Sequence, residues 1–152
     1  MIKSSLPVIL IADDDAEDRL LAQEALEASD FKGKIYFVED GEELMDYLLG
    51  NGKYSDRQVY PVPSLVLLDL NMPKKDGREA LREIKALNEY HSLPVVVLTT
   101  SSNDEDIVRS YDLGVNSFLN KPVRFVDFVA LMNSLCTYWF GFNKYPIAPQ
   151  MR

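Results

Sequence analysis

The chain has 152 residues, the size of one domain that can bury roughly two-thirds of its unfolded surface. Its hydrophobic fraction of 47% and charged fraction of 26% are those of an ordinary globular protein. The net charge of −8 argues against general binding to nucleic acid or to anionic membranes, because such binding needs clustered Lys and Arg. No apolar run approaches the ~20 residues of a membrane-spanning helix.

Cysteine usage and the start of the chain indicate a cellular compartment. The single cysteine, Cys136, lies in an apolar segment and is expected to be a small core side chain, so no disulfide framework exists. The first residues lead directly into a strand near Val8, without room for a signal peptide and its cleavage site. Both features predict a cytoplasmic protein.

Five short apolar runs are predicted to be strands, and each is followed by a segment with helical features. The strands are expected at residues 8–12, 35–38, 64–69, 95–98 and 115–119. The helices are expected at about residues 16–28, 40–50, 76–87, 103–114 and 124–140. This regular alternation of strand and helix predicts a doubly wound parallel sheet with helices on both faces.

Polar residues mark the boundaries of several of these helices. Asp40 and Asp76 are expected to cap the second and third helices, and Glu43 to reach back as in a capping box. Gly114 is expected to stop the fourth helix, and acidic residues in its first turn suit the helix dipole. The connection at residues 50–63 is long for a compact domain.

The stretch from Leu65 to Asp69 is the most informative part of the chain. Leu65–Leu68 is an unbroken apolar run, as expected for a strand buried on both faces, and it ends abruptly on a carboxylate. Ligands of open α/β sheets bind beyond the carboxyl ends of the strands. Asp69 is therefore a candidate site residue, although an Asp after a strand is also a common turn former.

Polar residues follow other strands in the same way. Asp13 and Asp14 follow the first strand, Thr99 ends the fourth and Lys121 follows the fifth. Carboxylates that converge with Asp69 at one sheet edge would repel one another unless a cation intervenes, and Mg²⁺ suits such a site. A carboxylate can also act as a nucleophile and form an aspartyl phosphate, which a metal, an ammonium and a hydroxyl would stabilise. Each residue alone could be a cap or a surface charge, but their joint occurrence favours a site.

This set of residues resembles the receiver domain of bacterial two-component response regulators over about residues 7–140. The matching positions are Asp13-Asp14, Asp69, Thr99 and Lys121-Pro122. The longer strings at residues 68–79 and 95–101 resemble the phytochrome-associated, single-domain subgroup. The fold implied is a flavodoxin-like (βα)5 sheet in the order 2-1-3-4-5. Residues 1–140 would form the receiver and 141–152 a C-terminal tail, with no output domain.

The resemblance implies a role for each matching residue. Asp69 would accept a phosphoryl group from a phosphohistidine of a partner sensor histidine kinase, which the narrower resemblance suggests is phytochrome-like. Asp14 would bind Mg²⁺ directly, Asp13 would bind it through water, and Asn71 would offer its backbone carbonyl. Thr99 and Lys121 would contact the phosphoryl oxygens, and their movement toward the phosphoryl group would rearrange the surface of the fourth helix, fifth strand and fifth helix.

Other consequences of the resemblance concern the fifth strand and the kind of protein. Phe118 would be the switch aromatic, at a position where tyrosine is also frequent, so a readout that needs the hydroxyl is in doubt. The Lys121–Pro122 bond would be cis. The protein would be a signalling phosphoacceptor that at most catalyses its own phosphorylation and dephosphorylation, and it would signal through protein contacts.

The last predicted helix is apolar around more than one face. Its large apolar side chains include Phe125, Phe128 and Trp139. Either the tail, with Phe142, Tyr145 and Ile147, folds back over this helix, or the helix region forms a homodimer. The homodimer is the favoured interpretation. Tyr54 and Tyr60 in the long connection could serve a similar purpose or cover the sheet edge.

Three other functions fit the same alternation of strands and helices. A phosphatase of the haloacid-dehalogenase class needs a second acid two residues after its nucleophile, where this chain has Asn71. A flavodoxin-like cofactor carrier needs a phosphate loop after the first strand, where three acids, Asp13–Asp15, would repel phosphate. A receiver-shaped scaffold that accepts no phosphate is the third. His91, the only histidine, is expected in a surface loop and not as a phosphotransfer residue.

Overall fold

The computed structural model describes residues 6–146 and shows one five-stranded sheet. All four strand pairs are parallel and the order is β2-β1-β3-β4-β5, which confirms the predicted fold. The strands are β1 (Val8–Ala12), β2 (Lys34–Val38), β3 (Leu65–Leu68), β4 (Val95–Thr99) and β5 (Ser117–Asn120).

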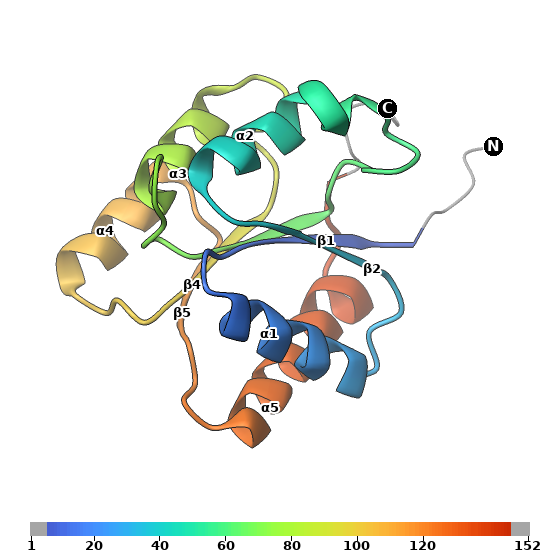
Figure 1. Cartoon of the computed structure of the whole chain (residues 1–152). Coiled ribbons are helices and arrows are strands. Elements are labelled where there is room, and N and C mark those ends of the chain that lie inside the picture. Colours follow the sequence, from blue (N-terminus) through green and yellow to red (C-terminus); the bar gives the residue numbers. More distant parts are fainter. Residues whose placement is uncertain (1–5, 147–152) are drawn as a thin grey trace.

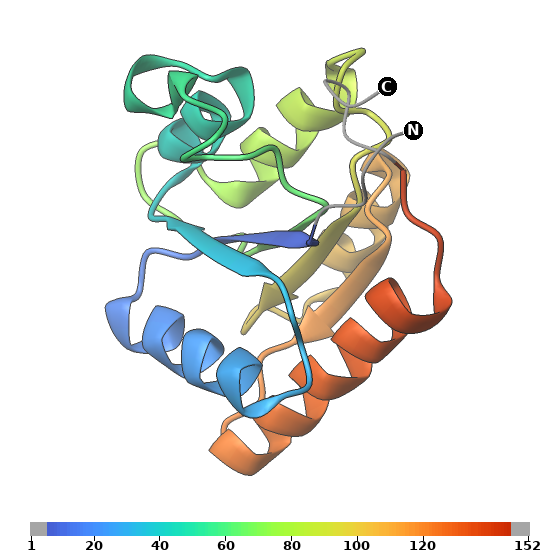
Figure 2. The same cartoon turned by 90° about the vertical axis from the view of Figure 1, so that its right-hand side faces the viewer.

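Helices cover both faces of the sheet, as predicted (Figures 1 and 2). Helices α1 (Ala16–Ala28) and α5 (Phe125–Cys136) lie side by side on one face. Helices α2 (Gly41–Leu49), α3 (Gly77–Ala86) and α4 (Asp104–Leu113) pack in sequence on the other. A short 3₁₀ helix, η1 (Gly52–Ser55), follows α2, and a π-helical segment, η2 (Thr137–Phe142), continues α5.

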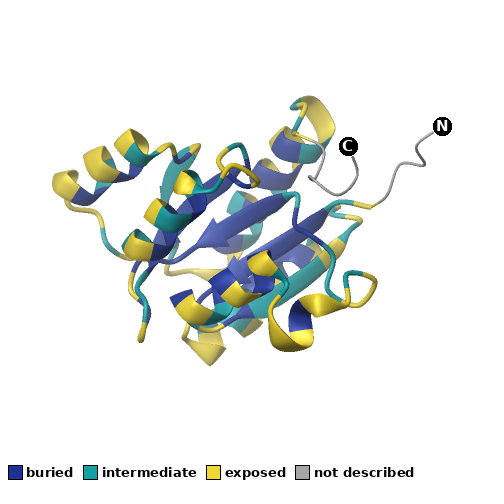
Figure 3. Ribbon diagram, turned by 90° about the horizontal axis from the view of Figure 1, so that it is seen from above, coloured by how far each residue is buried: buried dark blue, intermediate teal, exposed yellow. Residues whose placement is uncertain are grey.

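The apolar runs of the sequence form the three central strands. Every residue of β1, β3 and β4 is buried, whereas β2 and β5 at the edges are mostly half-buried (Figure 3). Side chains alternate between two core clusters, so that Leu65 and Leu67 face α1 and α5 while Val66 and Leu68 face the other helices. Strands buried on both faces need no polar positions, which explains the unbroken run of Leu65–Leu68.

Side-chain caps define where the helices begin. Asp15, Asp40, Asp76 and Asn103 each accept a hydrogen bond from a backbone N–H in the first turn of the helix that follows. Glu43 reaches back as expected, but it accepts from the N–H of Glu39, the residue before the cap, and not from that of Asp40 as in a standard capping box. Such caps satisfy N–H groups that have no partner within the helix.

The fifth strand begins two residues later than predicted. Gly114 adopts a left-handed conformation (φ 107°) at the end of α4, and the Val115 N–H donates to the Ser110 carbonyl. Residues 115–116 are therefore used to terminate the helix, and β-pairing starts at Ser117. The apolar character of Val115 suggested a strand, but this side chain is buried beside the helix end.

The long connection after α2 is ordered by an arginine and a group of tyrosines. The Arg57 guanidinium donates to the carbonyls of Tyr47 and Leu48, 2.8 Å from each, and so satisfies the end of α2. Tyr54 and Tyr60 pack with Tyr47, at ring-centroid distances of 4.9–5.9 Å, and Tyr60 also packs on Tyr36 of edge strand β2. Tyr60 therefore covers part of edge strand β2, which is one of the two roles expected of these tyrosines, whereas Tyr54 packs on α2 and on Tyr60.

Helix α5 and segment η2 form one continuous helical stretch, Phe125–Phe142. Its 18 residues have a mean hydropathy of 1.2, enough by length and composition alone to cross a membrane, which corrects the expectation that no segment approaches such a span. Helices that pack into a protein core meet the same criterion. Here Phe128, Met132 and Leu135 belong to the core beneath the sheet, but only 28% of the stretch is buried.

The Lys121–Pro122 bond is not cis, since no cis peptide bond occurs in residues 6–146. The cis form expected from the resemblance is therefore absent from this structure. A trans bond is intrinsically favoured by about 0.5–1 kcal/mol for residues before proline. In the trans form the Lys121 N–H still donates to the Thr99 carbonyl, at 2.9 Å, and the side chain reaches the sheet edge.

Candidate functional site

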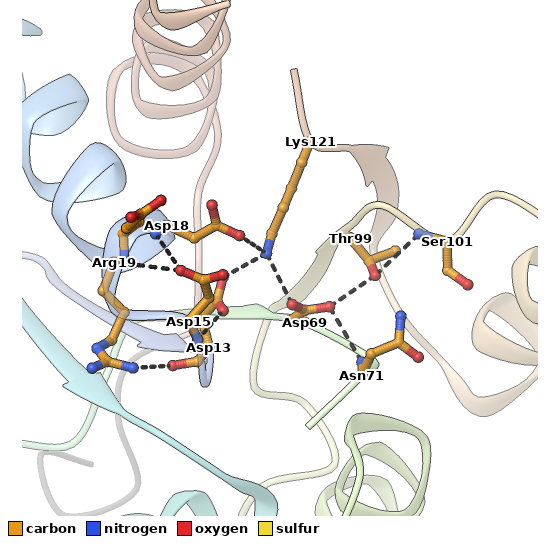
Figure 4. A network of polar contacts seen from close by, with 10 residues as sticks. Asp13, Asp15, Asp18, Arg19, Asp69, Asn71, Thr99, Ser101 and Lys121 are labelled. Carbon is orange, nitrogen blue, oxygen red and sulfur yellow. Dashed lines mark hydrogen bonds and ion pairs between the residues drawn. The ribbon is translucent and has the colours of Figure 1, made fainter. Parts of the chain in front are cut away.

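The ends of four strands bring the predicted site residues together (Figure 4). Asp13 follows β1, Asp69 follows β3, Thr99 ends β4 and Lys121 follows β5. Because all strands are parallel, their carboxyl ends lie at the same edge of the sheet. The four side chains contact one another directly there, as the sequence predicted.

Asp69 lies at the centre of this group. Its Oδ1 accepts hydrogen bonds from the Thr99 hydroxyl at 2.8 Å and from the Asn71 backbone N–H at 3.2 Å. Its Oδ2 is 2.9 Å from Lys121 Nζ. The start of α3 packs against the backbone of Asp69, so closely that a Cβ at Gly77 would collide with the Asp69 carbonyl oxygen. The carboxylate is thus held by three donors from three different parts of the chain.

Lys121 is the hub of the charged contacts, which we call the Lys121 network: Lys121 with Asp13, Asp18 and Asp69. Its Nζ lies 2.6 Å from Asp13, 2.8 Å from Asp18 and 2.9 Å from Asp69. The Lys121 side chain is only 7% exposed. An ammonium has three N–H donors, so each donor finds a carboxylate.

Burial and charge affect the two sides of this network differently. Burial raises the pKa of Asp13 above its ordinary value, against the opposing effect of the hydrogen bond from Lys121. Burial alone would lower the pKa of Lys121, but hydrogen bonds to Asp13, Asp18 and Asp69 outweigh it and raise that pKa. Lys121 is therefore protonated at neutral pH, whereas Asp13 ionises at an energetic cost.

The carboxylates form a group suited to a metal ion. Asp13, Asp14 and Asp69 each offer an oxygen, and these oxygens lie within 4.8 Å of one another. Asp13 and Asp69 are buried, while Asp14 is exposed and accessible to a hydrated ion. Mg²⁺ takes one or two carboxylates and keeps several waters, so this all-oxygen set fits it. Lys121 offers one positive charge to three carboxylates, those of Asp13, Asp18 and Asp69, so the site carries an excess of negative charge.

Two other predicted residues lie close to the site. Asn71 is exposed and its backbone N–H contacts Asp69, while its side chain lies 3.4 Å from Arg78. Phe118 is half-buried in the middle of β5 and packs against the core on the side of α2, α3 and α4. Their roles as metal ligand and switch stay predictions.

A second group of charged residues at the same edge was not anticipated. We call it the Arg78 network: Arg78, Ser101, Asn103 and Asp106. Arg78 on α3 donates to both oxygens of Asp106 on α4, at 2.7 and 2.6 Å. Ser101 and Asn103 also donate to Asp106, and the Arg78 hydrogen bond lowers the pKa of Asp106.

Sequence reasoning missed Asp18, Arg78 and Asp106 for one reason. All three lie in the first turns of predicted helices, where polar residues are normal. The available signal was their helical phase: Asp18 comes one turn after Asp14, and Asp106 follows the cap Asn103 by three residues. The remaining candidates behaved as expected, since Cys136 is buried, with its pKa raised by burial to about 12, and His91 is exposed in a turn.

A comparison with protein families identifies this arrangement. The model of the response regulator receiver domain matches residues 9–133, which include all of the site and every strand except the first residue of β1, Val8. The chain belongs to the response regulator receiver family. This finding confirms the resemblance that the grouped strand-end residues suggested.

Relatives of the receiver match it along nearly its whole length. Response regulator Rcp1 of Synechocystis sp. PCC 6803 is 40% identical over 93% of this chain and 94% of its own. The structure of the phosphorylated cyanobacterial phytochrome response regulator RcpA has 38% identity and a TM-score of 0.87, covering 94% of this chain and 100% of RcpA. The Mn²⁺-bound structure of Rcp1 has 39% identity and a TM-score of 0.84, covering 93% and 99%.

Membership of the family determines the kind of activity. Receiver domains are signalling proteins of two-component systems: their partner is a sensor histidine kinase, and they are phosphorylated on an aspartate. They also bind a divalent metal, which agrees with the Asp13, Asp14 and Asp69 group. The expectations of a phosphorelay function and of a divalent cofactor such as Mg²⁺ are thereby confirmed.

Proposed function

We propose that Asp69 is the phosphoacceptor of this receiver. The observation that carries the proposal is the position of its carboxylate, which lies at the end of the most buried strand with Thr99 Oγ1 at 2.8 Å and Lys121 Nζ at 2.9 Å. A hydroxyl and an ammonium on opposite oxygens supply the donors that an added phosphoryl group needs. No other carboxylate among residues 6–146 contacts both donors.

The reaction forms a bond between an Asp69 oxygen and phosphorus and breaks the P–N bond of a phosphohistidine. The electron pair of the broken bond stays on the imidazole nitrogen, and the histidine leaves as a neutral ring when its other nitrogen carries a proton. Lys121 stays protonated and meets the negative charge of the transferred group, and Thr99 donates to one of its oxygens. The receiver thereby assists its own phosphorylation, and hydrolysis of the acyl phosphate by water restores Asp69.

Asp14, as the exposed member of the acidic group, is proposed to bind Mg²⁺ directly. Asp13 would hold it through water, Asp69 would be a ligand, and the Asn71 backbone carbonyl would complete the protein's share. When bound, the ion neutralises charge on the phosphoryl oxygens. Exposure of Asp14 and burial of Asp13 support this division, since the ion enters from solvent.

The readout is proposed to run through Thr99 and Phe118. Thr99 is fully buried, so its movement toward a phosphoryl group vacates space beside β5, into which a half-buried aromatic ring can turn. Phe118 has no hydroxyl, so its two positions would differ in packing alone. The surface of α4, β5 and α5 would change as a result.

The finer identity of the partners rests on similarity and on exposed apolar residues. We propose a phytochrome-like sensor histidine kinase, in the cytoplasm, because the similar protein RcpA is a cyanobacterial phytochrome response regulator. Residues 1–140 are proposed as the receiver and 141–152 as a tail. No nucleic acid and no membrane is proposed as a partner.

A homodimer through the C-terminal helix region is also proposed. Tyr145 packs on Phe140 at 5.3 Å, so part of the tail does fold back, but Val126 and Phe142 stay 59% and 78% exposed. Ile147 lies outside the described residues. Large apolar side chains exposed along this one helical stretch, Val126, Tyr138 and Phe142, are the surface that such a dimer would bury.

The test of the acceptor is an intact-mass measurement. The protein is incubated with Mg²⁺ and acetyl phosphate beside an Asp69→Asn variant. We expect a single phosphate adduct on the wild type, lost on removal of Mg²⁺ and absent from the variant. An equal adduct on the variant, or none on either, would reject Asp69 chemistry and favour a receiver-shaped scaffold that only binds partners.

A further inference from the structure

The Lys121 network contains one carboxylate that the metal group does not. Asp18 lies in the first turn of α1 and binds Lys121 Nζ at 2.8 Å, yet the oxygens grouped for a metal come only from Asp13, Asp14 and Asp69. Its side chain is 32% exposed, against 7% and 9% for Asp13 and Asp69. Asp18 therefore contacts the lysine from the solvent side of the site.

We propose that Asp18 is a positioning residue that holds the Lys121 ammonium beside the acceptor when a divalent cation takes Asp13 and Asp69. This inference rests on the metal and acceptor assignments of the proposed function. It gives Asp18 a role toward the reaction without placing it in contact with the transferred group.

Competition for oxygen atoms is the physical basis. Lys121 binds the same two carboxylates, Asp13 and Asp69, that a divalent cation would use. A cation at these oxygens offsets part of the negative charge of Asp13 and Asp69. Two of the three ion pairs of the Lys121 ammonium therefore become weaker. Asp18 is outside the metal group and keeps its charge. The ammonium then has a partner 2.8 Å away and need not compete with the metal or swing into water.

The helix that carries Asp18 is fixed to the site. Asp15 caps α1 by accepting from the N–H groups of Glu17 and Asp18, at 2.8 and 3.2 Å. The Arg19 side chain donates to the Asp13 carbonyl at 2.8 Å and so ties the first turn of α1 to the end of β1. Asp18 is therefore presented from a rigid element, as positioning requires.

A simpler role for Asp18 would be that of a first-turn acid that favours the helix dipole. Glu17 fills that role equally and is exposed without contacting Lys121. Glu17→Gln therefore removes the same charge from the same turn while leaving the Lys121 contacts intact. It is the matched control for Asp18→Asn.

The experiment measures Mg²⁺ binding by titration calorimetry, without phosphodonor. We expect Asp18→Asn to raise the Mg²⁺ dissociation constant roughly two- to fivefold, the range of a partly exposed ion pair. Glu17→Gln should change it less than twofold. Lys121→Met should bind Mg²⁺ more tightly than the wild type, because the competing ammonium is gone. Asp18→Glu should recover most of the loss, and urea unfolding should show all variants folded.

The decisive comparison repeats both charge removals in the Lys121→Met background. There, Asp18→Asn should have no more effect than Glu17→Gln. An equal loss of Mg²⁺ affinity with and without Lys121 would mean that Asp18 acts only as a nearby charge, and would overturn the proposal. Because the readout is metal binding, it stays interpretable even if the Asp69→Asn mass experiment rejects the acceptor.

Discussion

The Lys121 and Arg78 networks lie at the same edge of one sheet but differ in charge balance. In the first, a single ammonium faces three carboxylates, and Asp14 adds a fourth nearby. In the second, one guanidinium binds both oxygens of Asp106, and neutral donors from Ser101 and Asn103 complete it. Arg78 also lies 3.8 Å from the more exposed Asp76.

This difference separates a structural contact from a reactive one. A bidentate pair with its remaining oxygens satisfied has no reason to bind further ions, and it joins α3 to α4. In a site with excess negative charge the carboxylates repel one another. Binding of a cation relieves this repulsion, so the site favours a metal ion. The pKa shifts agree with this distinction. The hydrogen bond from Arg78 lowers the pKa of Asp106, whereas burial raises the pKa of Asp13.

The largest effect is expected from breaking the Arg78 network, in which the charges are balanced. Arg78→Ala leaves Asp106 buried and without its bidentate partner, which should lower the free energy of unfolding by about 2–3 kcal/mol. Urea unfolding would measure this. Arg82→Ala, an exposed arginine on the same helix, is the control and should stay within ~0.5 kcal/mol of the wild type. A stability loss no larger than that of the control would show that the pair contributes nothing to folding.

Adding Mg²⁺ should stabilise the folded protein, and it should do so only through the Lys121 network, which has an excess of negative charge. At a concentration of ten times its dissociation constant, Mg²⁺ should raise the free energy of unfolding by about 1.4 kcal/mol. Arg78→Ala should gain the same amount, whereas Asp14→Asn should gain little. These gains are read from urea curves with Mg²⁺ or with chelator. A similar gain in Asp14→Asn would place the metal elsewhere.

Removing an acid from the unbalanced network should stabilise the metal-free protein. The raised pKa of Asp13 means that its contribution to stability is present at low pH and lost as pH rises through the folded-state value. At pH 7 its charge is therefore a cost. Asp13→Asn should raise the free energy of unfolding by about 1 kcal/mol in chelator, while an asparagine still accepts from Lys121. A destabilised variant would indicate that the Lys121 pair outweighs repulsion.

The smallest expected effect is the pH dependence of the stability that the Arg78 network contributes. Because Arg78 lowers the pKa of Asp106, the stabilisation is fully present above the ordinary carboxyl pKa of ~4 and is lost as pH falls through the folded-state value. The difference in unfolding free energy between wild type and Asp106→Asn should therefore narrow below pH ~4. Urea unfolding across this pH range tests it, and a constant difference would contradict the assignment.

The sequence by itself determined the fold class and the centre of the site. The unbroken run of Leu65–Leu68 requires burial on both faces, and alternation with helices then makes the strands parallel. Parallel strands end at one edge, so residues that follow them, such as Asp13, Asp69 and Lys121, meet regardless of their distance along the chain. The strand-end rule is enough to group these residues without a structure.

Only the tertiary structure decided which helical side chains join them. Asp18 meets Lys121 across 103 positions in sequence and Arg78 meets Asp106 across 28, in both cases from helix turns where polar residues are ordinary. The spacing within a helix places Asp18 on the side of Asp14 and Asp106 one turn after its cap, but the partner that each side chain reaches depends on how the helix packs over the sheet, which no local pattern encodes. The late start of β5 has the same origin, because the end of α4 competes for Val115.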